Sequence, residues 1–187
     1  MARAEHGYRW RVTDAPDLAR TEGATESYSP LLPDDLEEHI RAVLERVAAA
    51  ELSLATAESC TGGMLASVLT DVHDLSGVFE RGFVVYSEPA KCELLGLAQA
   101  DIDRCGVVSE EVAVAMAEGA LANSLADIAV ATTGYADDGP EPGRVHIACA
   151  RRDRPTLHRE ERFGAIGRGP VRIASMRVAL QLIDEVL

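Results

Sequence analysis

Lysine is almost absent from this chain of 187 residues: of its 18 basic residues, only Lys91 is a lysine, and the others are arginine. Arginine does not lose its proton in a protein, whereas a lysine becomes neutral where its surroundings lower its pKa. A single lysine in an arginine-biased chain is therefore a candidate for chemistry that needs an uncharged amine. The alternative is that chance alone left one basic position as lysine.

Other shortages exclude several classes of protein. The formal net charge of −13 argues against a nucleic-acid partner, because an acidic surface repels phosphates. The local exception, the arginines at 151, 152 and 154, is typical of a solvated strand end or turn. Apolar runs stay well short of the ~18 residues of a membrane span, and the N-terminus lacks the apolar core of a secretory signal. We therefore expect a cytoplasmic protein that does not insert into membranes.

Cysteine and histidine are too few and too scattered to indicate a metal site. The four cysteines contain no C-x-x-C pair, and the five histidines show no metal-ligand spacing. We expect reduced thiols, no metal and no cofactor.

The apolar fraction of 47% is ample for one core, and aromatics at 4% make that core aliphatic and alanine-rich. Residues 1–32 are charged, mixed in sign and interrupted by Pro16, Gly23 and Pro30, which predicts a flexible N-terminal tail. Residues 33–187 form the predicted domain. Homo-oligomer formation stays open.

Hydrophobic periodicity predicts alternating strands and helices in this domain. A helix starts at Pro33-Asp34-Asp35 and buries a stripe of apolar residues. Strands are expected over 52–57, 78–86, 127–133, 144–150 and 156–163, and helices over 61–70, 89–95, 110–124 and 168–187. This order predicts an α/β three-layer sandwich, with a mostly parallel or mixed sheet and helices on both faces.

Ligand sites in such sheets lie beyond the carboxyl ends of the strands. Three segments occupy that position: the turn at Ser59, the strand end at Tyr86, and residues 132–134. The turn at Ser59 joins a strand to a helix and contains Gly62 and Gly63, which leave room for a ligand to approach the backbone. A serine hydroxyl needs a base to act as a nucleophile, and a neutral lysine can serve.

Several short motifs carry a resemblance to a known family. They are Thr-Ala-Glu-Ser-Cys-Thr-Gly-Gly at 56–63, Tyr86-Ser87 with Lys91 five residues after the tyrosine, Leu-Leu-Gly at 94–96, Gly-Val-Val-Ser-Glu-Glu at 106–111, Met-Ala at 116–117 and Thr133-Gly134. Over roughly residues 36–187, the sequence resembles the C-terminal domain of the competence/damage-inducible CinA proteins. The stand-alone members of that family include nicotinamide-nucleotide amidases.

The resemblance implies an amidohydrolase that converts nicotinamide mononucleotide to nicotinate mononucleotide and ammonia, with this small nucleotide as its partner. Carried over by motif, Ser59 is the nucleophile, Lys91 its base, and Tyr86 a proton relay or a holder of Lys91. The implied substrate-binding residues are Thr61, Gly62, Gly63, Thr133, Gly134 and Arg168. Other interpretations stay open: Tyr86 packs on the sheet, Thr61 caps a helix, Arg168 is an exposed first-turn residue, and Cys60 is a rival nucleophile or a small buried residue.

The mechanism sets two further expectations. Backbone N–H groups at the start of the 61–70 helix stabilise the oxyanion. Glu58 and Glu88 would keep the amine of Lys91 charged if they pointed at it, so we expect both to point elsewhere or to bond backbone groups.

The loop at 135–143 departs from the family pattern. Its three carboxylates, Asp137, Asp138 and Glu141, would repel a nucleotide phosphate unless they face away. Three hypotheses follow: a nicotinamide-nucleotide amidase, an amidase or acyl hydrolase for a less anionic substrate, and a catalytically silent binding or assembly module with the same fold.

Overall fold

The computed structural model describes residues 32–187, so the predicted flexible tail lies almost entirely outside the described residues and stays a prediction. The strands are β1 Leu54–Glu58, β2 Phe79–Val84, β3 Ile128–Gly134, β4 Arg144–Arg151 and β5 Leu157–Arg162. The helices are α1 Asp34–Ala49, α2 Met64–Thr70, α3 Glu88–Leu95, α4 Gln99–Cys105, α5 Glu110–Ala122 and α6 Arg168–Val186, with a 3₁₀ turn, η3, at Ser76–Val78.

The strands form one mixed sheet in the order β2-β1-β3-β4-β5. β1 pairs in parallel with both β2 and β3, while β4 pairs antiparallel with β3 and with β5. The register aligns Glu58 with Val84 on one side and with Thr132 on the other. The carboxyl ends of the three parallel strands therefore lie level, so the segments that follow them meet at one edge of the sheet.

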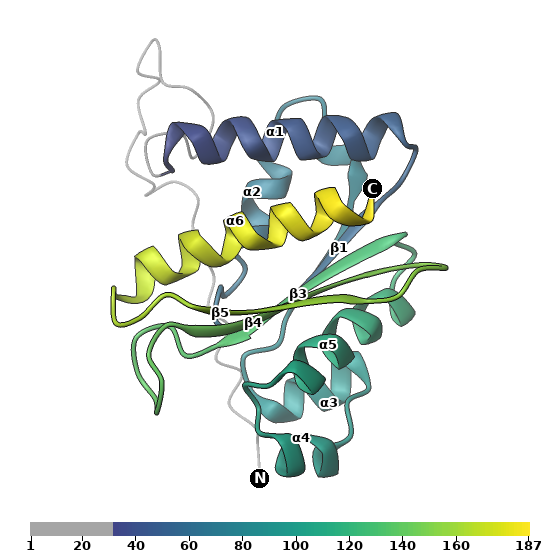
Figure 1. Cartoon of the computed structure of the whole chain (residues 1–187). Helices are drawn as coiled ribbons and strands as arrows, with labels where there is room; N and C mark the ends of the chain where they lie inside the picture. Colours follow the sequence, from purple (N-terminus) through teal and green to yellow (C-terminus); the bar gives the residue numbers. More distant parts are fainter. Residues whose placement is uncertain (1–31) are drawn as a thin grey trace, which may run out of the picture.

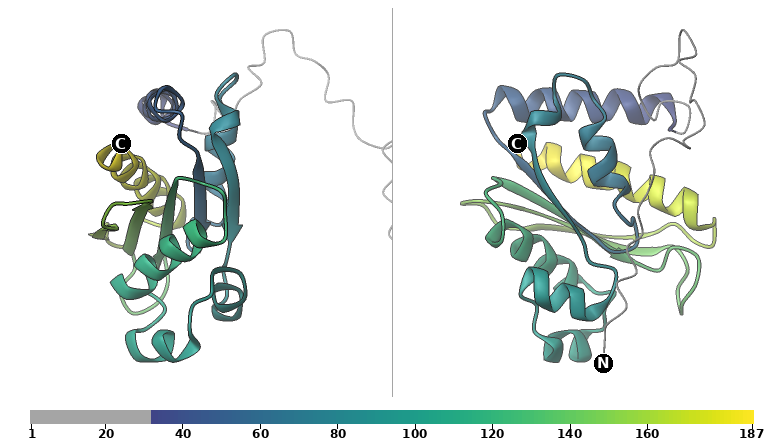
Figure 2. Two further views of the ribbon diagram at one scale, coloured as in Figure 1. Left: turned by 90° about the vertical axis from the view of Figure 1, so that its right-hand side faces the viewer. Right: turned by 180° about the vertical axis from the view of Figure 1, so that it is seen from behind.

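Helices cover both faces of the sheet, as predicted. Helices α1, α2 and α6 lie on one face and α3, α4 and α5 on the other, which Figure 1 and the rear view in Figure 2 show. Alternating residues of each strand face the two layers: Ile128 and Val130 point to the first, and Ala129 and Ala131 to the second. The alanine-rich second face lets α5 approach the sheet closely.

Small residues also bring α3 against α5. A Cβ atom placed on Gly119 of α5 would lie 2.3 Å from the carbonyl oxygen of Leu95, at the end of α3. Only glycine permits this approach. Ser87 begins α3 by accepting a hydrogen bond from the Ala90 N–H. Together these contacts fix the short helix that carries Lys91.

The predicted strands and helices are confirmed, with shifted ends and omissions. The helix expected from residue 61 begins at Met64, because Gly62 and Gly63 adopt positive φ angles of 63° and 93° and prolong the turn. The strand expected to reach Tyr86 ends at Val84. Helix α4 and the η3 turn were not predicted; α4 buries only Ile102, so it carries no apolar stripe.

Candidate active site

Lys91 and Ser59 meet at the edge where the parallel strands end. The Nζ atom of Lys91 lies 3.1 Å from the Oγ atom of Ser59, and it donates a hydrogen bond of 2.8 Å to the carbonyl oxygen of Val85. Lys91 is fully buried, and Ser59 is 9% exposed. The pair therefore sits within proton-transfer distance in a nearly dry environment.

Burial lowers the pKa of the Lys91 amine below its ordinary value, because a charged ammonium loses its hydration there. The thiol of Cys60 and the carboxylate of Glu88 act weakly in the opposite direction. Within residues 32–187, no carboxylate forms an ion pair with Lys91. A neutral amine would satisfy its surroundings fully, since it can donate to the Val85 carbonyl and accept from the Ser59 hydroxyl.

Both nearby glutamates are engaged elsewhere, as the sequence analysis required. The buried carboxylate of Glu58 accepts hydrogen bonds from the backbone N–H groups of Gly63, Leu65 and Ala66, at 3.0, 3.1 and 2.8 Å. Glu88 accepts a hydrogen bond from Gln99 of α4. Neither carboxylate contacts the amine, so burial dominates its pKa.

The engagement of Glu58 corrects one expectation. The N–H groups at the start of α2 already bind this carboxylate, so they are not free for an oxyanion. Among residues 32–187, the N–H groups of Cys60 and Thr61 donate no hydrogen bond to another residue, whereas that of Ser59 donates to the carbonyl oxygen of Thr132. The candidate oxyanion donors are therefore the N–H groups of Cys60 and Thr61, in the turn that precedes α2.

Cys60 is poorly suited to be the nucleophile. It is 4% exposed, and burial raises the pKa of its thiol to about 11, so the thiol is protonated near neutral pH. Its carbonyl oxygen accepts a hydrogen bond of 2.8 Å from the Nε atom of Arg172 in α6. Arg172 therefore holds the turn from outside.

Ser59 opens into a pocket of about 190 Å³. We use floor for Ser59 with its buried neighbours Glu58 and Lys91, and mouth for Tyr86, Asp138 and Arg168 with Asp137, the ion-pair partner of Arg168. Glu58, Lys91 and Asp137 do not themselves line the pocket. The lining residues are Ser59, Cys60, Tyr86, Val107, Val108, Thr133, Gly134, Tyr135, Ala136, Asp138 and Arg168. They come from the ends of all three parallel strands, the segment before α5 and the first turn of α6.

The predicted site residues fall into two groups. Thr133, Gly134, Tyr86 and Arg168 line the pocket together with Ser59. Tyr86 is 64% exposed and does not hold Lys91. The amine of Lys91 instead donates a hydrogen bond to the carbonyl oxygen of Val85.

Thr61, Gly62 and Gly63 do not line the pocket, so their position does not support the predicted contact with substrate. The Thr61 hydroxyl lies 2.7 Å from that of Thr132 and caps no helix. The two glycines instead provide the left-handed turn.

The charged side chains of the 135–143 loop are paired with arginines. Arg168 binds Asp137 through Nε, at 3.1 Å, and through its terminal nitrogen, which also lies 3.7 Å from Asp138. Hydrogen bonding to Tyr86 and to Asp137 raises the pKa of the Arg168 guanidinium. Glu141 turns away and pairs with Arg144 and Arg162.

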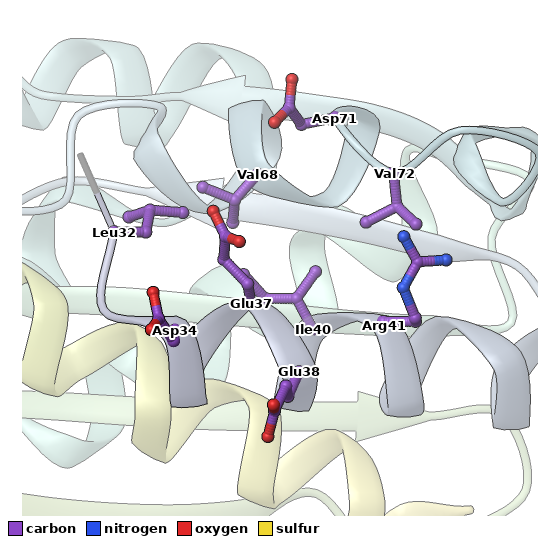
Figure 3. Close-up of a pocket in the computed structure, with 9 residues that line it drawn as sticks. All are labelled: Leu32, Asp34, Glu37, Glu38, Ile40, Arg41, Val68, Asp71 and Val72. Atoms are coloured by element: carbon purple, nitrogen blue, oxygen red, sulfur yellow. The ribbon is translucent and has the colours of Figure 1, made fainter. Parts of the chain in front are cut away.

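A second, larger cavity of about 380 Å³ lies between α1 and α2 and shares no lining residue with the Ser59 pocket (Figure 3). Its lining contains four carboxylates, one guanidinium and aliphatic side chains: Leu32, Asp34, Glu37, Glu38, Ile40, Arg41, Val68, Asp71 and Val72. No serine, cysteine, histidine or lysine belongs to this lining. Of these two cavities, only the pocket at Ser59 contains a serine or cysteine side chain.

Sequence reasoning missed three contributors to the site. The carbonyl of Val85 orients Lys91, Arg172 holds the turn, and Val107 with Val108 closes one side of the pocket. Arg172 was detectable in principle, because it follows Arg168 by one helical turn and shares its face. The role of a backbone carbonyl has no sequence signal.

The fold and the site together define an α/β protein whose serine–lysine pair sits at the carboxyl ends of parallel strands. The family model of the CinA C-terminal domain matches residues 36–187, so the chain belongs to this family. The resemblance noted from the motifs is thereby confirmed.

Solved structures agree with this assignment. The structure of the competence/damage inducible protein CihA from Agrobacterium tumefaciens has 40% sequence identity and a TM-score of 0.80, covering 83% of this chain and 97% of that one. A competence-damaged protein (CinA) superfamily protein from Escherichia coli has 34% identity and a TM-score of 0.76, covering 83% and 94%.

Curated relatives match a shorter region. A CinA-like protein from Akkermansia muciniphila is 50% identical over 117 residues, which cover 60% of this chain but only 28% of that protein. Protein YdeJ from Escherichia coli is 43% identical over 110 residues, 59% of this chain and 63% of YdeJ. The chain thus spans less than a third of the Akkermansia protein. Within residues 32–187, no helix has the length and apolarity needed to cross a bilayer.

Proposed function

We propose that this chain is an amidohydrolase that removes the amide nitrogen of nicotinamide mononucleotide by a serine–lysine mechanism. The observation that carries the proposal is the 3.1 Å separation between Ser59 Oγ and the buried Nζ of Lys91. Membership of the CinA family supports the same activity, since nicotinamide-nucleotide amidases resemble this domain.

In the first half of the reaction, Ser59 Oγ attacks the carboxamide carbon while its proton moves to the neutral amine of Lys91. The carbonyl oxygen becomes an oxyanion, and the N–H group of Cys60, which borders the pocket, is its proposed donor. The C–N bond then breaks, and the ammonium of Lys91 gives its proton to the departing amide nitrogen, which leaves as ammonia.

In the second half, water enters the pocket and attacks the acyl-Ser59 ester. Lys91 accepts a proton from this water and delivers it to Ser59 Oγ as the ester bond breaks. The carboxylate product leaves, and both side chains return to their starting states. Each step uses the same amine first as base and then as acid.

The test measures ammonia released from nicotinamide mononucleotide by the purified chain. S59A should lower kcat by about 10³-fold or more, because no other group at the floor can form the acyl intermediate. S67A serves as the matched control, since this serine lies on the adjacent helix α2 and does not line the pocket. C60A tests whether Cys60 is the nucleophile instead, and this variant should retain most of the wild-type kcat.

A substrate-independent probe extends this test. An acyl or phosphonate reagent should attach to Ser59 in the wild-type chain and fail in S59A, as read by mass spectrometry of the modified peptide. Absence of labelling together with absence of ammonia release would favour the silent binding module.

One observation favours a second candidate, an acyl hydrolase for a less anionic amide. Arg168, the cation that lines the pocket, is already bonded to Asp137. A phosphate-bearing substrate would have to compete for this guanidinium. Comparison of amides with and without a phosphate distinguishes the two candidates.

A further inference from the structure

The mouth of the pocket holds a guanidinium whose bonding positions are largely taken. Arg168 projects from the first turn of α6 and binds both carboxylate oxygens of Asp137, with Asp138 3.7 Å away. The Arg168 and Asp137 side chains are 36% and 38% exposed. A substrate anion could therefore reach the guanidinium, but it would find a carboxylate already bound there in bidentate geometry, the arrangement that suits a phosphate as well.

Asp137 differs from the third carboxylate of its loop. Glu141 is bound by Arg144 and Arg162, which belong to β4 and β5, whereas Asp137 is bound by Arg168, which lines the pocket. Asp137 and Asp138 place two negative charges against the single positive charge of Arg168. The loop thus divides its carboxylates: Asp137 and Asp138 lie beside the pocket-lining Arg168, and Glu141 pairs with arginines of β4 and β5.

We propose that Asp137 is a specificity-determining residue: it occupies Arg168 in the place that a substrate phosphate would take, and so weakens the preference of the site for phosphorylated amides. This inference rests on the proposed amidase function and specifies its substrate class. The wild-type chain should hydrolyse a nicotinamide nucleoside nearly as well as the corresponding nucleotide. Asp138 adds to the effect more weakly, because it lies farther from the guanidinium.

The first experiment compares kcat/KM for nicotinamide mononucleotide with that for the nucleoside lacking the phosphate, at fixed pH and ionic strength. D137N should raise the nucleotide-to-nucleoside ratio about tenfold, through a lower KM for the nucleotide, with kcat little changed. E141Q removes the same unit charge from the same loop without releasing Arg168, so it should change the ratio less than about twofold. Equal ratios in D137N and wild type, or an equal rise in E141Q, would overturn the inference.

A second experiment needs no turnover. Inorganic phosphate is titrated by calorimetry into the wild-type chain, D137N, and the double variant D137N/R168M. D137N should bind phosphate about tenfold more tightly than wild type, and the double variant should lose that gain. D137S provides a second removal of the carboxylate should D137N fold poorly.

The two experiments separate the failure of this inference from the failure of the proposed function. Tighter phosphate binding by D137N without ammonia release from any amide would uphold the Arg168–Asp137 competition and refute the amidase. Amidase activity with unchanged phosphate binding in D137N would refute the competition alone.

Discussion

The side chains at the floor of the Ser59 pocket are buried, and Glu58 and Lys91 among them bond backbone groups, whereas those at its mouth are more exposed and are joined mainly to each other. Glu58 and Lys91 have no exposed surface, and each bonds main-chain atoms of a strand end or helix start. Tyr86 and Arg168 border solvent, and Arg168 bonds the side chain of Asp137.

The two regions therefore differ in how readily substitutions can alter their geometry. The backbone partners of Lys91 and Glu58 are supplied by the fold, so they hold the base and the turn that carries the nucleophile in place. Side-chain partners at the mouth can be replaced one at a time. We infer that the floor determines the reaction and the mouth determines which substrate reaches it.

Loss of the neutral amine should have the largest effect. K91R keeps a positive charge but cannot supply a base at neutral pH, so kcat for ammonia release should fall about 10³-fold or more. Stopped and continuous ammonia assays on equally folded samples check this result. A K91R variant that retains wild-type kcat would show that the amine is not the base.

The pH dependence of the wild-type rate should follow the amine. Because burial lowers the pKa of Lys91 below 10.5, kcat should rise about tenfold per pH unit and then reach a plateau below that value. The chain has a single lysine, so ¹³Cε-lysine labelling gives one NMR signal that reports this titration directly. A midpoint at or above 10.5 would contradict the account.

The free energy of unfolding should respond in opposite directions at the two buried ionisable residues of the floor. E58Q replaces one acceptor oxygen by an amide NH₂, leaving a helix N–H unpaired, and should lower the free energy of unfolding by about 1.5–3 kcal/mol. K91M removes an amine whose charged form burial disfavours, and should raise it by on the order of 1 kcal/mol, net of the donor that the Val85 carbonyl loses. Urea unfolding at pH 7 measures both.

The effect of K91M should also depend on pH with a defined sign. The folded-state pKa of Lys91 is lowered, so the unfolded chain binds more protons between that pKa and 10.5. The wild-type free energy of unfolding therefore rises with pH across this window, and the advantage of K91M shrinks. A constant difference across the window would mean that Lys91 titrates normally in the folded chain.

The elements of the fold were predictable because each carries its own periodic pattern. The stripe of α1, the apolar runs of β1 and β3 and the cap at Ser109 are all local signals, and the structure places them as expected. The pairing of Ser59 with Lys91 was also accessible, since both follow neighbouring parallel strands and only one lysine exists. Helix α4 was not, because a single buried residue makes no pattern.

The electrostatic details of the site were less accessible, because they depend on side chains far apart in sequence. Arg168 and Asp137 are separated by 31 residues, and only the path of the 135–143 loop brings them together. Glu58 was expected to point away from the amine or to bond backbone groups or threonine hydroxyls, and its three N–H partners follow from the turn that delays the start of α2. For that reason the candidate oxyanion donors are the N–H groups of Cys60 and Thr61 and not those that begin α2.

The smallest effect should come from the mouth. D137N, which is expected to change substrate preference, should alter the free energy of unfolding by less than about 0.5 kcal/mol, because an ion pair between partly exposed side chains contributes little in water. Urea unfolding of D137N and E58Q measures both changes in the free energy of unfolding, and equal m values show that the two results can be compared directly. A loss in D137N as large as that in E58Q would mean that the Arg168 pair supports the fold, and specificity and stability would then not be separable between mouth and floor.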